Sequence, residues 1–160
     1  GLTIPMSGMA DLKISAANLA DVFVIYPDDF HGIVPKMLLN EGEVVLRGQP
    51  IFYSKANPEI KFVSPISGTL AKIERGAKRR ITALSIVADG KDKAVVHKLA
   101  KLDKLGAADV KKHLLESGCW PFMKQRPYDV IADPNNTPKA MVRSGFSTAP
   151  LAANVPFILS

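Results

Sequence analysis

Two stretches punctuated by glycine decide the fold: residues 41–51, EGEVVLRGQPI, and residues 64–70, SPISGTL. In the first stretch, Gly42 and Gly48 flank a short β-branched run, and glycine easily takes the positive φ of a tight corner. In the second, a proline fixes the entry and Gly68 allows a bend with no Cβ to clash. Short strands that fold back at such corners are typical of a β sandwich or barrel rather than of a βαβ sheet.

Further short apolar runs lie on both sides of these stretches and alternate with turns. In residues 80–88, Thr82, Leu84, Ile86 and Ala88 recur with period two, which predicts one buried face of a strand. The expected core residues are Phe62, Leu70, Leu84 and Ile86. Strands are expected at residues 22–26, 35–39, 50–53, 60–63, 69–74, 80–88 and 94–99.

The pattern changes after residue 100. Residues 106–118 predict a helix with Ala107, Val110, Leu114 and Leu115 on one face and Gly118 just after its end. Residues 119–138 contain four prolines and predict a loop-like arm, and residues 139–144 predict the first strand of a second domain. We therefore expect a leader (1–20), a β domain (21–100), a helix and proline-rich arm (101–138) and the start of a second, truncated domain (139–160).

Composition excludes several classes of protein. The chain has 160 residues, of which 47% are hydrophobic and 22% charged, as in a globular protein with a core. Cys119 is the single cysteine, so neither an internal disulfide nor a cysteine-based metal site is expected. The three histidines lack metal-ligand spacing, and no apolar run approaches the roughly 20 residues of a membrane span.

Charge is distributed unevenly along the chain. The net charge is +6, and residues 61–112 carry thirteen Lys and Arg against five Asp and Glu. Five of these cations surround one predicted turn and form the candidate contact site for an acidic partner. A nucleic-acid partner is not expected, because Phe62 is the only aromatic residue in this block and stacking platforms are missing. The candidate site residues are Lys72, Arg75, Lys78, Arg79 and Arg80.

A weak internal repeat relates residues 34–42 to residues 64–76 at an offset of 30. Two such halves, together with the glycine-punctuated stretches, resemble the barrel-sandwich hybrid fold of biotinyl and lipoyl carrier domains. In those carriers a lysine on an exposed hairpin is modified. The counterpart here is Lys55, but its flanks do not match the carrier motif, so we expect it to be exposed and unmodified.

A second resemblance covers nearly the whole chain. Residues 1–8 (GLTIPMSG), 29–37 (DFHGIVPKM), 54–58 (SKANP), 114–120 (LLESGCW) and 149–152 (APLA) are similar to the A subunits of sodium-translocating NADH:quinone reductases. Cys119 departs from the leucine usual in that family. The resemblance implies a fragment of a longer chain, in which an α/β, Rossmann-like domain follows the barrel-sandwich hybrid domain.

The resemblance also implies a function. The parent would be a peripheral subunit on the cytoplasmic face of a six-subunit bacterial inner-membrane complex, which couples NADH oxidation and ubiquinone reduction to Na⁺ export. That complex uses NADH, flavins, iron–sulfur centres and quinone. No cofactor, metal or catalytic residue is expected in this chain, which would dock and position rather than catalyse. The alternatives are a biotinyl or lipoyl carrier domain and the homologous subunit of a ferredoxin-linked electron-transport complex.

Two smaller clusters are further candidates for sites. Asp28 and Asp29 form a carboxylate pair in a turn with no histidine partner nearby in sequence, which favours turn solvation over acid–base chemistry. Trp120, Phe122 and Met123 could contact a quinone or a membrane subunit. Packing between the helix and the barrel is the simpler interpretation of these three side chains.

Overall fold

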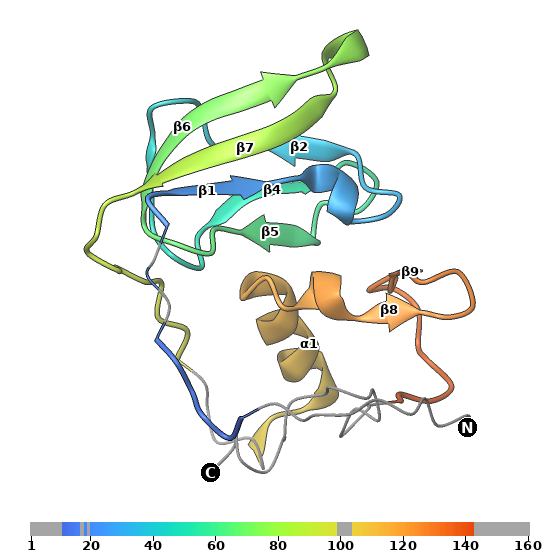
Figure 1. Cartoon of the computed structure of the whole chain (residues 1–160). Coiled ribbons are helices and arrows are strands. Elements are labelled where there is room, and N and C mark those ends of the chain that lie inside the picture. The colour runs from blue at the N-terminus through green and yellow to red at the C-terminus, as the bar shows by residue number, and fades with distance from the viewer. Residues whose placement is uncertain (1–10, 17, 19, 99–103, 143–160) are drawn as a thin grey trace, which may run out of the picture. The chain divides into compact units, whose positions relative to one another are not determined.

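A computed structural model describes residues 11–16, 18, 20–98 and 104–142 of the chain (Figure 1). The chain divides into two units, Gly1–Leu19 with Pro138–Ser160, and Ala20–Thr137. In the first unit the described residues form no helix or strand. Every element described below belongs to the second unit.

The second unit contains a four-stranded and a three-stranded antiparallel sheet, which Figure 1 shows above the helix. The strand order is β1-β7-β6-β3 in the larger sheet and β2-β4-β5 in the smaller. No helix connects neighbouring strands as a βαβ unit would across the described residues 22–88. The bounds are β1 Val22–Ile25, β2 Pro35–Met37, β3 Val44–Val45, β4 Pro50–Ser54, β5 Lys61–Val63, β6 Gly68–Arg75 and β7 Ile81–Ala88, with 3₁₀ turns η1 Pro27–Asp29 and η2 Ala77–Arg79.

The core lies between the two sheets and contains all four residues expected from the sequence. Phe62 is 4% exposed, and Leu70, Leu84 and Ile86 are fully buried. Phe52 stacks on Phe62 with ring centroids 4.4 Å apart. The burial of large aliphatic and aromatic side chains supplies most of the driving force for folding.

The two glycine-punctuated stretches are hydrogen-bonded to each other. Gly42 and Gly48 have φ of +87° and +81°, as expected of corner residues. The Gly42 N–H donates to the Leu70 carbonyl (2.7 Å), and the Leu70 N–H donates to the Glu43 carbonyl (2.9 Å). At Gly68 a Cβ would collide with the carbonyl group of Val87 on the neighbouring strand. Glycine at this position is therefore required by close approach of two backbones.

The period-two face predicted for residues 80–88 is wrong in its first half. Leu84 and Ile86 are buried as expected, but Ile81 and Ala83 are buried where Thr82 was expected. The pairing of β6 with β7 shifts register at two points, between Leu70 and Lys72 and between Glu74 and Arg75. The buried face of β7 changes between Ala83 and Leu84, next to the second of these irregularities, so strict alternation fails.

Two other expected strands are not formed in the parts of their ranges that the structure describes. In residues 94–99, only Ala94 makes a bridge, to Arg47, and residues 95–98 are irregular. The hydrogen bonds of Arg47 to Lys93 and Val95 hold this segment at one point only. In residues 139–144, the described part, 139–142, contains no strand. Leu99, Arg143 and Ser144 lie outside the described residues.

The expected helix is α1, Ala107–Glu116, and Gly118 follows it with φ of +71°. Leu114 and Leu115 pack against the core, whereas Val110 is 38% exposed. The arm is more regular than its prolines predicted, because they lie outside its two short strands. It contains the 3₁₀ turn η4 Trp120–Phe122 and the paired strands β8 Lys124–Gln125 and β9 Val130–Ile131.

Candidate functional site

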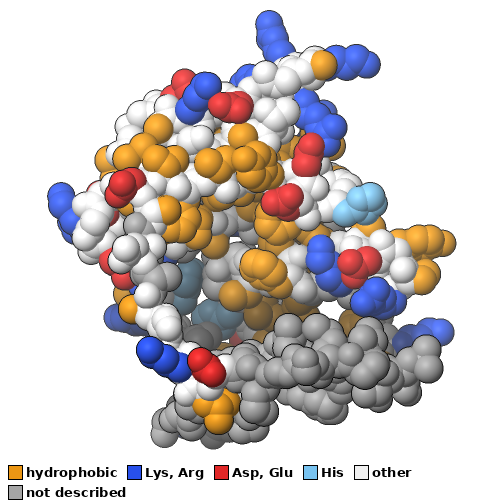
Figure 2. Space-filling model, in the orientation of Figure 1, with side chains coloured by type: hydrophobic (Ala, Val, Ile, Leu, Met, Phe, Trp, Pro, Cys, Tyr) orange, Lys and Arg blue, Asp and Glu red, His pale blue; other side chains and the backbone are white. Residues whose placement is uncertain are grey.

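The candidate site lies at the end of the β6–β7 hairpin, where Figure 2 shows Lys and Arg side chains gathered. Lys78 and Arg79 occupy the two turn positions, with φ of +54° and +60°. The Arg80 N–H closes the turn on the Ala77 carbonyl (3.2 Å). A two-residue hairpin turn with positive φ at both positions matches strand twist and usually contains Asn-Gly. Two long cationic residues here are held in a backbone conformation that costs roughly 1–2 kcal/mol each.

Two of the five predicted cations have carboxylate partners. Arg80 Nη2 lies 2.6 Å from Asp28 Oδ1, which joins the hairpin to η1. Lys72 Nζ lies 3.0 Å from Glu74 Oε1 on the same strand. Both pairs are largely exposed, and exposed pairs contribute about 0–1 kcal/mol to stability.

The other three cations have no carboxylate within 4 Å among the described residues. Arg75 Nη1 donates instead to the Arg79 carbonyl (3.3 Å), which holds its guanidinium beside the turn. Lys78 and Arg79 extend from the turn itself. Three uncompensated cations on one short turn create a local positive potential that attracts anions.

A groove of about 590 Å³ runs beside this turn. It brings together four of the five predicted residues, and Lys72 does not line it. The opposite wall is the segment from Phe30 to Pro35 together with Asp28. The residues from Phe30 to Pro35 were missed as site residues, because they lie 40 to 50 positions earlier in the chain than the hairpin turn and nothing local links the two segments. Asp28 was a candidate only as half of a carboxylate pair with Asp29, and its link to the hairpin was not predicted. The groove is lined by Asp28, Phe30, His31, Gly32, Ile33, Val34, Pro35, Arg75, Lys78, Arg79, Arg80 and Ile81.

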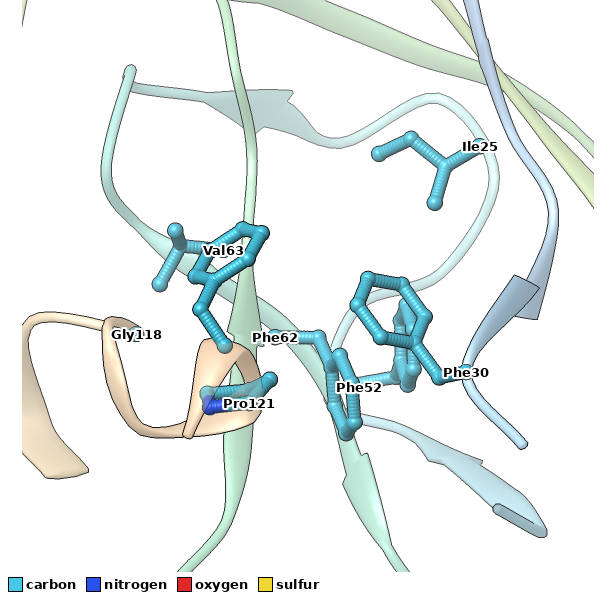
Figure 3. A pocket seen from close by; sticks show the side chains of 8 residues that line it. Ile25, Phe30, Phe52, Phe62, Val63, Gly118 and Pro121 are labelled. Atoms are coloured by element: carbon cyan, nitrogen blue, oxygen red, sulfur yellow. The ribbon is translucent and has the colours of Figure 1, made fainter. Parts of the chain in front are cut away.

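A second, smaller cavity of about 60 Å³ lies between the barrel and the arm (Figure 3). Figure 3 shows Phe30, Phe52 and Phe62 on the barrel side, with Gly118 and Pro121 of the arm facing them. None of the described residues that line it has a charged or hydrogen-bonding side chain, and its volume is far below the roughly 300 Å³ of small-molecule sites. It is a packing gap at the junction of barrel and arm.

In the arm, the predicted cluster of Trp120, Phe122 and Met123 has two packed side chains and one exposed side chain. Trp120 is 8% exposed, and its Nε1–H donates to the Ala132 carbonyl (2.8 Å). Met123 also packs against the core, so both side chains follow the packing interpretation. Phe122 differs, because it is 75% exposed.

Lys55 is exposed in the turn between β4 and β5, as expected. Its N–H donates to the Val34 carbonyl (2.9 Å). Two residues further on, Asn57 Nδ2 donates to Asp133 Oδ1 of the arm (3.2 Å). The turn that carries Lys55 is therefore hydrogen-bonded both to Val34 and to the arm.

The two antiparallel sheets closed by glycine corners define the class of the chain, which is a barrel-sandwich hybrid. Residues 1–89 match the family described as the NqrA N-terminal barrel-sandwich hybrid domain, and residues 105–160 match the NqrA second alpha/beta domain. The chain belongs to the NqrA N-terminal domain family. From residue 105 the chain continues into the second, alpha/beta domain of NqrA proteins.

Curated relatives match the chain from end to end. Proteins named as the A subunit of the Na(+)-translocating NADH-quinone reductase are 32% identical in Pseudomonas aeruginosa and in Haemophilus influenzae, and 35% identical in Tolumonas auensis. The alignments cover 99–100% of this chain and 36% of each relative. The chain therefore spans about a third of the length of these relatives.

No helix among the described residues is long and apolar enough to cross a bilayer.

Proposed function

We propose that the chain is the N-terminal part of the A subunit of a Na⁺-translocating NADH:quinone reductase, and that it docks and positions this subunit on its partners. Family membership and end-to-end similarity to relatives with this name support the assignment. The observation that carries the docking role is the hairpin turn with Arg75, Lys78 and Arg79, three cations without a carboxylate partner among the described residues. The domain boundaries after residues 20, 100 and 138 are part of this proposal.

The whole protein would take part in NADH oxidation, ubiquinone reduction and Na⁺ export. Its partners would be the other members of a six-subunit complex, and it would lie peripherally on the cytoplasmic face of the bacterial inner membrane. Ubiquinone would bind near the parent subunit. Flavins and iron–sulfur centres would be held outside residues 1–160, in which we expect no cofactor site.

Two alternatives are weaker. A carrier domain would need a modifiable Lys55, whereas this turn is tied to Val34 and to the arm. Intact mass spectrometry after coexpression with biotin and lipoate ligases tests this, and we expect no mass increase. A ferredoxin-linked complex would share the fold, but the relatives described above are named as sodium-translocating reductases.

Copurification tests the docking role. The full-length protein containing this chain would be tagged and purified from membranes in mild detergent, with partner subunits identified by mass spectrometry. We expect the wild-type protein to retain its partners and to lose them progressively as salt rises, because exposed charges are screened. A wild-type protein that never retains partners, at any salt concentration, would contradict the proposed function.

A further inference from the structure

The groove beside the hairpin has two chemically different walls. One wall is cationic and is formed by the end of β6 and the turn into β7. The other is mainly apolar and includes Phe30, Ile33 and Val34, of which Val34 is 60% exposed. A ligand that fills this groove must therefore present negative charge on one side and apolar groups on the other.

The charges within the groove do not balance. Among the described residues, Asp28 is the only carboxylate that lines it, and this carboxylate is already bound to Arg80 at 2.6 Å. Arg75, Lys78 and Arg79 line the same space without an acidic partner in the described part of the chain. The Asp28–Arg80 pair shows how a carboxylate sits against this wall, and the remaining cations offer further positions of the same kind.

The backbone of the turn gives an independent indication. Lys78 and Arg79 both have positive φ, although the hairpin would form with less strain with Asn-Gly at these positions. Strained residues persist where the surroundings or the function require their side chains. Neither side chain contributes to the core, so the requirement lies on the outside of the protein.

We propose that the groove between the β6–β7 turn and residues 30–35 binds an extended acidic segment of a partner protein, in which carboxylates alternate with apolar side chains. Arg75 and Arg79 bind the carboxylates, and Ile33 and Val34 contact the apolar side chains. Arg80 is kept in place by Asp28. This inference rests on the proposed function, because it names the chemistry of the partner to which the subunit docks.

An anionic membrane surface is the competing occupant, and the turn fits it less well. The turn consists of Ala77, Lys78 and Arg79 and has no large apolar residue that could enter the bilayer. Three cations alone give weak binding to anionic lipid, since each contributes only a small attraction that salt screens. The volume of the groove and its apolar wall have no role at a flat surface but suit several side chains of a segment.

The test uses the full-length protein together with a fluorescein-labelled peptide of alternating glutamate and valine, and a glutamine–valine peptide serves as control. Binding is measured by fluorescence anisotropy. We expect Arg75→Glu and Arg79→Glu each to weaken binding of the acidic peptide about tenfold. We expect Val34→Asn to weaken it about fivefold, and Arg79→Lys to retain most of it.

Lys72→Glu is the matched control variant. It changes the net charge by the same amount on the same hairpin, but Lys72 pairs with Glu74 and does not line the groove. We expect less than a twofold change in binding. Thermal unfolding of each variant should match wild type, which separates loss of binding from loss of fold.

Three outcomes would overturn the inference. In the first, Lys72→Glu weakens binding as much as Arg79→Glu, so that only overall charge matters. In the second, the glutamine peptide binds equally well. In the third, phosphatidylserine vesicles bind through Arg75 and Arg79 while the acidic peptide does not. Copurification separates this inference from the proposed function. Partners retained by an Arg75→Glu/Arg79→Glu variant would reject the groove and its cations as the docking site and leave the assignment to the A subunit standing, whereas a wild-type protein that retains no partners would reject the proposed function itself.

Discussion

The two ends of the β6–β7 hairpin differ in burial and charge. At its base, Gly68, Leu70 and Ile86 are buried, and the backbones of the two strands approach too closely for a side chain at Gly68. At its tip, Lys78 and Arg79 are exposed and hold a strained turn. The same pair of strands thus has a base that packs in the core and a tip that presents charge to the outside. Substitutions at the base should change stability, and substitutions at the tip should change binding.

Gly68→Ala should produce the largest effect. The added Cβ would collide with the Val87 carbonyl, and a backbone group in the centre of a sheet cannot move aside. We expect a loss of more than about 4 kcal/mol in the free energy of unfolding, measured by urea denaturation. The control is Gly106→Ala, where the nearest atom is an ordinary 3.5 Å away and φ is −74°. Similar effects of the two substitutions would show that the base is not closely packed.

Leu70→Ala should produce the next largest effect. Leu70 is fully buried, and its removal leaves a cavity between the sheets. We expect destabilisation of about 3 kcal/mol by the same measurement. Arg79→Ala at the exposed tip of the same hairpin should change stability by less than about 0.5 kcal/mol. A larger effect at the tip than at the base would reverse the comparison.

Replacing Lys78-Arg79 by Asn-Gly should stabilise the protein and weaken docking at once. Both new residues take positive φ more easily, so we expect a gain of about 1 kcal/mol in the free energy of unfolding. Copurification of partner subunits should decrease, because two of the three uncompensated cations are lost. Unchanged stability would mean that the turn carries no strain, and unchanged copurification would mean that its charge is not used.

The smallest effect concerns a carboxylate at the base. The Ser67 hydroxyl donates to Asp89 Oδ1 (2.7 Å), and the Lys91 N–H donates to the same oxygen (2.9 Å). These hydrogen bonds, that of Ser67 first, hold the pKa of Asp89 below its ordinary value. The lowered pKa means that the stabilisation is fully present above the pKa of the unfolded chain and is lost as pH falls through that of the folded one.

An NMR titration of the Asp89 carboxyl checks this prediction. We expect a midpoint below that of the same carboxyl in the unfolded chain, and a midpoint shifted upward in Ser67→Ala. A titration of Asp89 that is unaffected by Ser67→Ala would assign the lowered pKa to the Lys91 N–H and to the charges of Lys91 and Lys93 instead.

The sequence was sufficient where the determinant is local. Positive φ at Gly42 and Gly48 follows from the steric freedom of glycine, and so does the positive φ of Gly118 just after the end of α1. The cluster of cations around residues 75–80 was also predicted, because a hairpin turn keeps neighbours in sequence close in space. The family resemblance was visible in short motifs, and the matches over residues 1–89 and 105–160 confirm it.

Tertiary structure decided what depends on distant pairing. In β7 Ala83 is buried in place of Thr82, beside an irregularity in its pairing with β6, and no alternation rule predicts this. The strand predicted over residues 94–99 has no partner beyond one bridge in its described part, so its β-branched content was not enough. The groove exists only because residues 30–35 fold back beside a turn more than 40 positions later, where Asp28 reaches Arg80. Sequence patterns reflect the conformational preferences of residues close together in the chain. Contacts between segments this far apart are fixed only when the sheets close around a common core.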